Sequence, residues 1–498
     1  MPAAQAQAGT ALPQLGDGSA MRASDERSLG DRIARELYRD PDYIDDPVIG
    51  HYVQGIWQSL LAAARARGDL SPELDERFAW RVLLGRDRSV NAFALPGGYL
   101  GLNLGLVAVV DNRDELASVL GHELSHVTQR HIARLMSNTE QQSPWVLAAT
   151  LLGMLAAGKN ADAGQALMVG GQAVAAQGQL NFSRDMEREA DRLGLGVMTQ
   201  AGYSAQGVVS MFDKLEQASR LNDRGAFPYL RSHPLTTQRI ADLHARIVLD
   251  APAARPADAQ QTLLHALVRA RARVLSDTGI EALRAWDDRV RSLNAQTPLT
   301  ERAAVLYGAT LAAAQRHDAI AAGQHLRGLR AVLNGQTLSM PMLDWLQAEI
   351  ALALGDQATP SLVQLLDALS AQDPKPSRPS VLYRAQLARQ SGKPERIEAA
   401  VDALQAHVAH DPADAAAWAA LADLYQALSR PTRALRAQAE ARAAQFDYAG
   451  ALDRLAAARD GLKAAPAQGQ AVEAAIIDTR TQQLQALLRG QLRDELRR

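Results

Sequence analysis

The sequence of 498 residues contains no cysteine, and this absence excludes three kinds of site. A cysteine nucleophile, a thiolate metal site and a disulfide framework all need the side chain that is missing. Chains without cysteine occur in reducing and in oxidising compartments, so this feature is compatible with both cytoplasm and periplasm. Catalytic or metal-binding chemistry must therefore come from other side chains.

Aromatic residues, net charge and long apolar runs are also scarce. Only 4% of the residues are aromatic, while alanine is abundant, which favours helices over a sheet-dominated fold. The formal net charge of -2 gives no electrostatic basis for a nucleic-acid partner, and we expect none. The longest apolar stretch, 145–158, would form a helix of roughly 21 Å, which is shorter than a bilayer core of about 30 Å. We expect a buried helix or a peripheral membrane contact there, and residues 138–179 as a whole could form a lid, a membrane contact or both.

The first residues give a weak indication of processing. Residues 1–22 are rich in Ala, Gln, Gly and Pro without any period, which predicts a disordered tail. The segment 1–8 lacks the basic start and apolar core of a signal peptide but resembles the small-residue end of one. We expect that a signal peptide has been removed ahead of this sequence.

The segment 120–126, Leu-Gly-His-Glu-Leu-Ser-His, has the form H-E-x-x-H. His122 and His126 are four residues apart, so on a helix they lie on the same face, and such a pair binds zinc while Glu123 activates a water molecule. Upstream, residues 111–115 supply a helix start with acidic side chains in the first turn. The sequence therefore predicts a zinc-binding helix with one zinc ion per chain. The alternatives are two histidines on an ordinary helix and a structural zinc site, which would have no use for Glu123.

Two carboxylates follow in the segment 181–191. A catalytic zinc held by two histidines needs a third protein ligand and a position for water. Glu187 and Asp191 are four residues apart and can both face the histidine helix. One could bind the metal while the other accepts a hydrogen bond from a ligand imidazole. Alone, this pattern would be an ordinary acidic helix face.

Short strands are predicted between the first helices and the zinc helix. Residues 80–84, 90–95 and 99–102 are strand-like, and 96–98 form a turn. The edge strand of such a sheet can bind an extended peptide by main-chain pairing. Peptide is therefore the favoured substrate class.

A His-Pro pair lies further along the chain. Pro234 predicts the start of a helix with His233 at its cap. Placed there, His233 and Arg239 could donate hydrogen bonds to the developing oxyanion of a tetrahedral intermediate. Outside this context, a helix cap would be the default interpretation.

These four segments, in this order, resemble the zinc peptidases related to the CAAX prenyl protease and HtpX, over about residues 24–250. The implied fold is an α+β zincin, gluzincin-like, mostly helical with a small sheet. The resemblance implies Glu187 as the third zinc ligand and Asp191 as the partner of a ligand histidine. It implies that His233 and Arg239 lie near the substrate carbonyl. The implied substrate strand comprises Asn91, Ala92, Phe93 and Ala94.

The C-terminal half is almost continuously helical from about residue 263 and carries a repeat. Turn residues and small residues each recur at intervals of 37, namely Gly355, Gly392 and Ser429, and Ala348, Ala385 and Ala422. A repeat of about 34 residues with a small residue at a helix crossing is typical of tetratricopeptide (TPR) repeats, which stack into a solenoid that binds protein partners. The segment 411–444 resembles such a repeat best, and an unrelated helical bundle is the alternative.

We therefore expect three parts: a disordered tail (1–22), a zinc metallopeptidase domain (23–255) and an all-α TPR-like solenoid (256–498). The absence of several long apolar spans makes the chain similar to the periplasmic branch of the family, which carries a C-terminal repeat domain. That resemblance implies an endopeptidase acting on misassembled outer-membrane proteins, with the barrel assembly machinery as a partner of the repeats. It also implies that His233 is a fourth zinc ligand that holds the enzyme closed. The alternative function is a chaperone or adaptor of outer-membrane protein assembly with a latent protease site.

Overall fold

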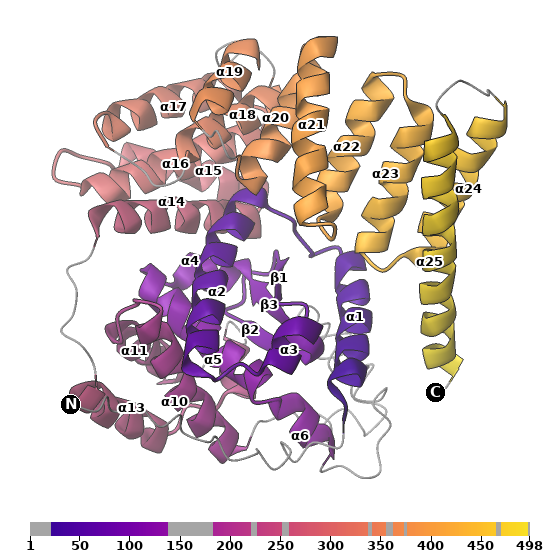
Figure 1. Ribbon diagram of the computed structural model, residues 1–498. Helices are drawn as coiled ribbons and strands as arrows, with labels where there is room; N and C mark the ends of the chain where they lie inside the picture. Colours follow the sequence, from indigo (N-terminus) through magenta and orange to yellow (C-terminus); the bar gives the residue numbers. More distant parts are fainter. Residues whose placement is uncertain are drawn as a thin grey trace, which may run out of the picture.

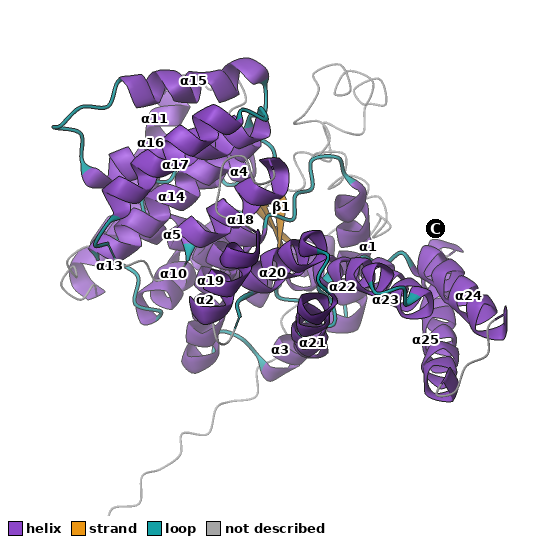
Figure 2. Cartoon of the chain, turned by 90° about the horizontal axis from the view of Figure 1, so that it is seen from above, coloured by secondary structure: helices purple, strands orange, loops and turns teal. Residues whose placement is uncertain are grey.

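The computed structural model describes most of the chain as helices around one small sheet (Figures 1 and 2). The described residues are 21–137, 183–220, 227–250, 258–336, 341–354, 362–372, 376–464 and 470–496. The expected tail up to residue 20 and the expected lid or membrane contact at 138–179 lie outside them. Within the described parts, no helix combines the length and the apolar character needed to cross a bilayer.

The sheet has three strands, β1 (Arg81–Gly85), β2 (Ala92–Leu95) and β3 (Tyr99–Asn103). Their order is β1-β3-β2, so β3 is central, with β1 parallel and β2 antiparallel to it. The short 3-10 helix η1 (Pro96–Gly98) makes the turn between β2 and β3. The predicted strands and turn are therefore confirmed, and β2 is an edge strand.

The sheet forms the middle layer of the N-terminal half. Side chains alternate between its two faces. Tyr99 and Leu95 pack against α1, whereas Leu100 and Leu102 pack into the larger core that also holds Trp57 of α2 and the apolar residues of α5. The helices of this half are α1 (Ala23–Arg39), α2 (Pro47–Arg67), α3 (Pro72–Arg77), α4 (Leu104–Val109), α5 (Arg113–Thr128), α6 (His131–Ser137), α10 (Arg184–Gln200), α11 (Gln206–Arg220), α12 (Tyr229–Ser232) and α13 (Thr237–Asp250).

Side-chain caps determine where the two helices that carry the site, α5 and α10, begin. The Asn112 side chain accepts from the backbone N–H of Glu115 at 2.9 Å and starts α5. The Ser183 hydroxyl accepts from the N–H of Met186 at 3.2 Å and starts α10. Such caps satisfy backbone donors that have no partner inside the helix. The predicted start of the zinc helix is thereby confirmed.

The expected helix start at Pro234 is wrong. His233 ends α12, where its backbone N–H donates to Tyr229 O at 3.0 Å, and the next helix, α13, begins only at Thr237. The hydroxyl of Thr236 accepts from the N–H of Arg239 at 3.3 Å and supplies the cap that was assigned to His233. Four residues, 233–236, separate the two helices, and the His233 side chain is buried in the core of the domain.

The C-terminal half is a succession of helices that pack in pairs. Helices α14, α16, α18, α20 and α22 contact one another in series, and α17, α19, α21 and α23 each pack on the helix before them. Ala348, Ala385 and Ala422 are all buried, and Gly392 and Ser429 both have positive φ at turns. The bounds are α14 (Ala259–Ser276), α15 (Ile280–Arg291), α16 (Leu299–Gln315), α17 (Ala319–Leu333), α18 (Met342–Leu354), α19 (Leu362–Gln372), α20 (Arg378–Ser391), α21 (Pro394–His410), α22 (Ala415–Ala427), α23 (Pro431–Ala444), α24 (Tyr448–Ala464) and α25 (Gln470–Leu496).

This succession curves over the N-terminal half and down one side of it (Figure 1). A buried guanidinium joins the two halves, because Arg271 of α14 contacts Asp46 at the start of α2 at 2.6 Å and Glu349 of α18 at 2.7 Å. Arg378 of α20 likewise contacts Asp45 at 2.7 Å. The two halves therefore share one buried and one exposed ion pair as well as an apolar core.

Candidate metal centre

Helices α5 and α10 cross at two glycines, which brings the predicted ligands together. A Cβ on Gly194 would lie only 2.9 Å from the backbone N of His122, and a Cβ on Gly121 would lie 3.2 Å from the backbone O of Gly194. The two backbones can approach this closely because neither residue has a side chain. Glu187 and Asp191, one turn apart on α10, consequently face the histidines of α5.

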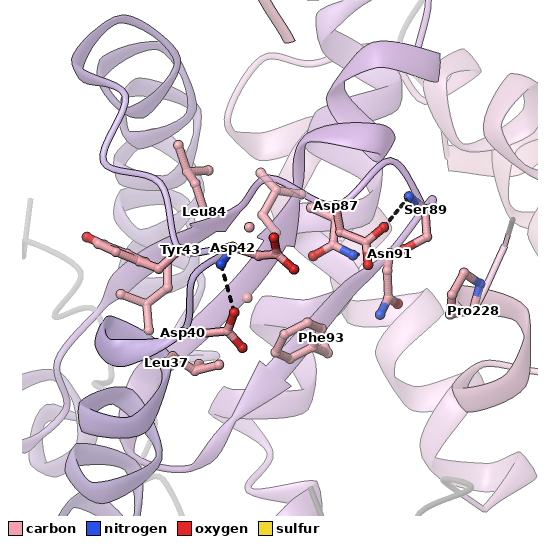
Figure 3. Close-up of a pocket in the computed structure, with 15 residues that line it drawn as sticks. Leu37, Asp40, Asp42, Tyr43, Leu84, Asp87, Ser89, Asn91, Phe93 and Pro228 are labelled. Carbon is pink, nitrogen blue, oxygen red and sulfur yellow. Dashed lines mark hydrogen bonds between the residues drawn. The ribbon is translucent and has the colours of Figure 1, made fainter. Parts of the chain in front are cut away.

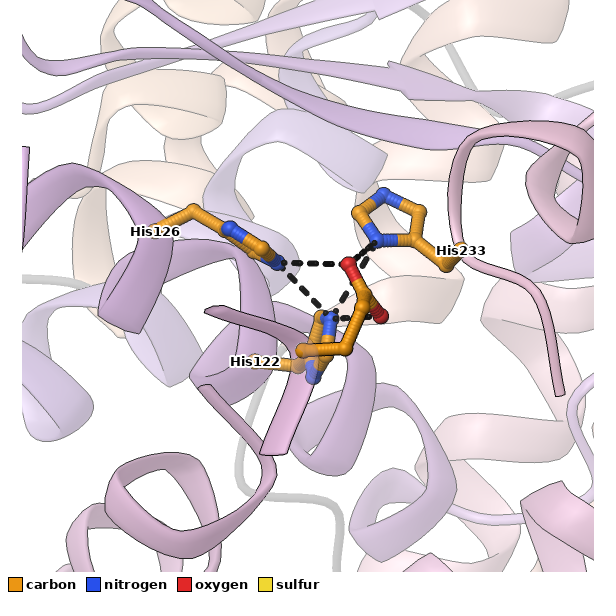
Figure 4. A group of neighbouring side chains, drawn as sticks. His122, His126 and His233 are labelled. Carbon is orange, nitrogen blue, oxygen red and sulfur yellow. Dashed lines mark hydrogen bonds and ion pairs between the residues drawn. The ribbon is translucent and has the colours of Figure 1, made fainter. Parts of the chain in front are cut away.

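Four donor groups converge at this crossing, His122 and His126 from α5, Glu187 from α10 and His233 from the end of α12 (Figure 4). All four side chains are buried. His122 Nε2 lies 3.0 Å from His126 Nε2 and 3.3 Å from His233 Nδ1. Glu187 Oε1 lies 2.9 Å from His233 Nδ1 and 3.4 Å from His126 Nε2.

The donor set fits a zinc ion. Imidazole nitrogen and carboxylate oxygen are zinc ligands, and bond lengths of roughly 2.0–2.2 Å place the corners of a tetrahedron about 3.3–3.6 Å apart. The four donor atoms lie within 4.8 Å of one another, and the spacings given above are close to this edge length. His233 takes the corner that water would need in an open catalytic site.

Asp191 and Arg239 lie behind His122. His122 Nδ1 is 3.0 Å from Asp191 Oδ1. Arg239 donates to both oxygens of Asp191, from Nε at 2.7 Å and from Nη2 at 2.8 Å, and its Nη1 donates to Pro234 O at 3.0 Å. Burial opposes ionisation of Asp191, but the hydrogen bonds from Arg239 hold the pKa of its carboxyl below the ordinary value. Arg239 is thus turned toward Asp191 at the edge of the donor cluster.

Burial also opposes ionisation of Glu187. The neighbouring imidazoles of His233, His122 and His126 nevertheless hold the pKa of the Glu187 carboxyl below its usual range. Arg239 Nη1 lies 2.8 Å from Glu187 Oε2. The carboxylate is therefore kept in the ionised form that binds cations.

Glu123 lies between the donor cluster and the edge strand. Its Oε2 accepts from the backbone N–H of Ala94 at 2.8 Å, and its Oε1 lies 3.3 Å from His233 Nε2. The side chain is fully buried. In β2, the backbone groups of Ala92 and Ala94 point away from β3, because Asn91 O pairs with Asn103 N on the opposite side. Glu123 therefore contacts the open edge of the strand predicted to bind substrate.

The rest of the expected substrate strand is divided between the two faces of the sheet. Asn91 precedes β2, and Phe93 points to the α1 face of the sheet, opposite Ala94. A pocket of about 650 Å³ opens on that face, lined by Asn91, Phe93 and the carboxylates of Asp40 and Asp87 (Figure 3). The pocket and Glu123 thus lie on opposite faces of β2.

Two residues of the site were missed by sequence reasoning. His131 Nδ1 lies 2.8 Å from His126 Nδ1, and His131 Nε2 lies 3.1 Å from Glu189 Oε2. The available signal was a third histidine five residues after His126. On a continuous helix that spacing would point it elsewhere, so the contact could not be anticipated.

Comparisons with known proteins agree with this geometry. Residues 58–247 match Peptidase family M48. The beta-barrel assembly-enhancing protease of Escherichia coli (strain K12) is 28% identical over 450 residues, which cover 89% of this chain and 85% of that protein. The beta-barrel assembly-enhancing protease of Yersinia pestis is 32% identical over 237 residues, about half of each chain (47%). The mitochondrial metalloendopeptidase OMA1 of Saccharomyces cerevisiae is 27% identical over 197 residues, 38% of this chain and 54% of that protein.

The matched segment contains every residue of the donor cluster and Glu123. The family is metal-dependent, and the buried group formed by His122, His126, Glu187 and His233 is a possible metal site. The resemblance found in the sequence is thus confirmed. Residues 58–247 thus carry the match to peptidase family M48 that supports a metalloendopeptidase, and the chain is similar to the beta-barrel assembly-enhancing proteases.

Proposed function

We propose that this protein is a zinc-dependent endopeptidase in which His122, His126 and Glu187 hold one zinc ion per chain. The observation that carries the proposal is the position of Glu123, whose carboxylate lies between this cluster and the N–H of Ala94 on the edge strand. A bound zinc ion would polarise the scissile carbonyl and lower the pKa of water.

Glu123 is the general base in this mechanism. Its buried carboxylate accepts a proton from the attacking water and then gives that proton to the leaving amine. The substrate backbone pairs with the outward-facing groups of Ala92 and Ala94, in the way that edge strands bind extended peptides. Since the Ala94 N–H now donates to Glu123, it must leave that carboxylate when the peptide binds.

The enzyme is closed in the arrangement described above. His233 fills the fourth corner of the donor cluster, and the N–H of Tyr229 donates to Val90 O at 3.3 Å, at the beginning of the substrate strand. Arg239 holds Asp191, and through it His122, while the oxyanion role expected for Arg239 stays a prediction. Displacement of His233 would open both the water position and the strand.

Two substitutions test this assignment. Glu123→Gln should lower hydrolysis of an unfolded protein such as casein by about 10²- to 10⁴-fold, with unchanged zinc affinity. The exposed Asp185, replaced by Asn, is the matched control on a neighbouring carboxylate. His233→Ala should weaken zinc binding and raise hydrolysis. If His233→Ala changes neither quantity, the closed state and the fourth ligand are both wrong.

The physiological setting is proposed from the names of the relatives. Their names support a role in outer-membrane barrel assembly, so we propose misassembled outer-membrane proteins in the periplasm as substrates. We also propose the division at 255/256 between peptidase and TPR-like solenoid, with the solenoid docking the barrel assembly machinery or substrates. The paired packing of α16 to α23 and the buried alanines at 37-residue intervals support the repeat.

A second function, chaperone or adaptor of barrel assembly, is favoured by the closed metal centre. The Glu123→Gln variant separates the two functions in cells that depend on this protein for outer-membrane assembly. Loss of assembly in that variant supports the peptidase, whereas full assembly would support the adaptor.

A further inference from the structure

His126 has a second histidine behind it, on the side away from the donor cluster. His131 Nδ1 lies 2.8 Å from His126 Nδ1, while His126 Nε2 faces His122 Nε2 at 3.0 Å. On its other side, His131 Nε2 lies 3.1 Å from Glu189 Oε2. His126 and His131 are fully buried. A line of contacts therefore runs from Glu189 through His131 to the metal-facing ring of His126.

A break between α5 and α6 makes this contact possible. Residues five apart on an uninterrupted helix differ by about 140° around its axis, so their side chains do not meet. Here α5 ends at Thr128, and Arg130 adopts a φ of 51°, in the left-handed region. Arg130 is held there by Glu26, whose Oε2 lies 2.9 Å from its Nε. The following residue, His131, is thereby turned back toward His126.

With both imidazoles neutral, hydrogen-bond chemistry allows one arrangement of protons along the line. The carboxylate of Glu189 only accepts, and Arg134 donates to it at 2.8 Å. His131 must then carry its proton on Nε2 and offer the lone pair of Nδ1 to His126. His126 must consequently carry its proton on Nδ1, which leaves the lone pair of Nε2 directed at the donor cluster.

We propose that His131 and Glu189 are positioning residues that fix His126 in the tautomer and orientation of an Nε2 ligand. This inference rests on the metal centre of the proposed function. His122 is oriented differently, because the carboxylate of Asp191 contacts its Nδ1 directly at 3.0 Å. Each of the two ligand histidines thus has its own carboxylate, one in direct contact and one acting through a second imidazole. Such partners hold the ring and increase its basicity.

The test measures zinc binding to the full chain by competition with a chromophoric chelator. His131→Leu removes the Nδ1 acceptor for His126 and should raise the zinc Kd about 10- to 100-fold. Glu189→Leu should also raise the zinc Kd. His131→Asn places its side-chain oxygen where Nδ1 was, so it can still accept from His126 and should stay within about threefold of the wild type. Asp185→Asn, at an exposed carboxylate of α10, is the matched control and should bind like the wild type.

A second readout separates positioning from general damage. The visible absorption bands of the cobalt-loaded protein report ligand geometry, and they should change in His131→Leu and return in His131→Asn. Wild-type zinc affinity in both His131→Leu and Glu189→Leu would overturn the proposal, as would equal losses in His131→Leu and His131→Asn. If His131→Leu does not fold, Glu189→Leu and His131→Asn decide between the same outcomes. If the proposed metal centre is itself wrong, the result differs, because His122→Ala would then leave the zinc affinity unchanged.

Discussion

Replacing Gly194 by alanine should force α5 and α10 apart and weaken the metal centre. The new Cβ would lie 2.9 Å from the backbone N of His122 and 3.0 Å from the backbone C of Gly121. Both atoms belong to the backbone of α5, so no side-chain rotation can relieve the contact. On an exposed helix face, replacing glycine by alanine stabilises a protein by about 0.5–1 kcal/mol. A loss of stability in Gly194→Ala would therefore identify the close helix contact as its cause.

The size of the effect follows from the distances. Reaching a van der Waals separation of about 3.5 Å requires a shift of roughly 0.6 Å. Overpacking of this kind costs about 1–3 kcal/mol, which exceeds or cancels the gain in helix propensity and leaves a net loss of up to about 2 kcal/mol. Because Glu187 and Asp191 move with α10, zinc affinity should fall by about tenfold or more.

Gly55→Ala provides the matched control. Gly55 lies on the exposed face of α2, and an added Cβ there would meet no atom within 4 Å. Calorimetric unfolding of the metal-free variants should show a higher midpoint for Gly55→Ala and a lower one for Gly194→Ala. An equal rise in both, with unchanged zinc affinity, would refute the argument that the close crossing positions the carboxylates.

Three further outcomes are expected. Arg271→Met leaves the buried Asp46 without its partner and should destabilise the protein by about 3–5 kcal/mol in urea unfolding, part of which Asp46→Asn should restore. Burial lowers the pKa of His265 to about 4, below the ordinary value of about 6.5, so the unfolded chain binds the extra proton first. Stability should therefore fall by about 2 kcal/mol between pH 6.5 and pH 5, measured by urea unfolding, and His265→Gln should flatten this fall. Arg239→Met removes both hydrogen bonds to Asp191 and should weaken zinc binding about 10- to 100-fold in the chelator assay.

The features that could be predicted from the sequence are local. The H-E-x-x-H pattern places His122 and His126 on one helix face whatever surrounds it, because helix geometry alone fixes their relation. Helix α2 is likewise bounded by local signals, since Asp46 caps its start and Gly68 ends it in the left-handed conformation. The strands before the zinc helix were recognisable for the same reason, by short runs between turn residues.

The features that could not be predicted depend on single backbone conformations between elements. The return of His131 to His126 requires positive φ at Arg130, a conformation that arginine rarely adopts. The neighbourhood of Arg239 depends on α13 starting three residues after Pro234, which lets its guanidinium reach Asp191 and the carbonyl of Pro234. No periodicity in the sequence encodes the conformation of Arg130 or the start of α13.

One short element controls both parts of the proposed active site. The N–H of His233 donates to Tyr229 O, so the two residues belong to the same turn of α12. Within that turn, Tyr229 contacts Val90 at the beginning of the substrate strand, while His233 occupies a corner of the donor cluster and approaches Glu123. Because these contacts are connected through three intervening residues, displacing the turn breaks them together. In the proposed function, displacement of His233 from the donor cluster is therefore coupled to release of the Tyr229 contact at the beginning of the strand.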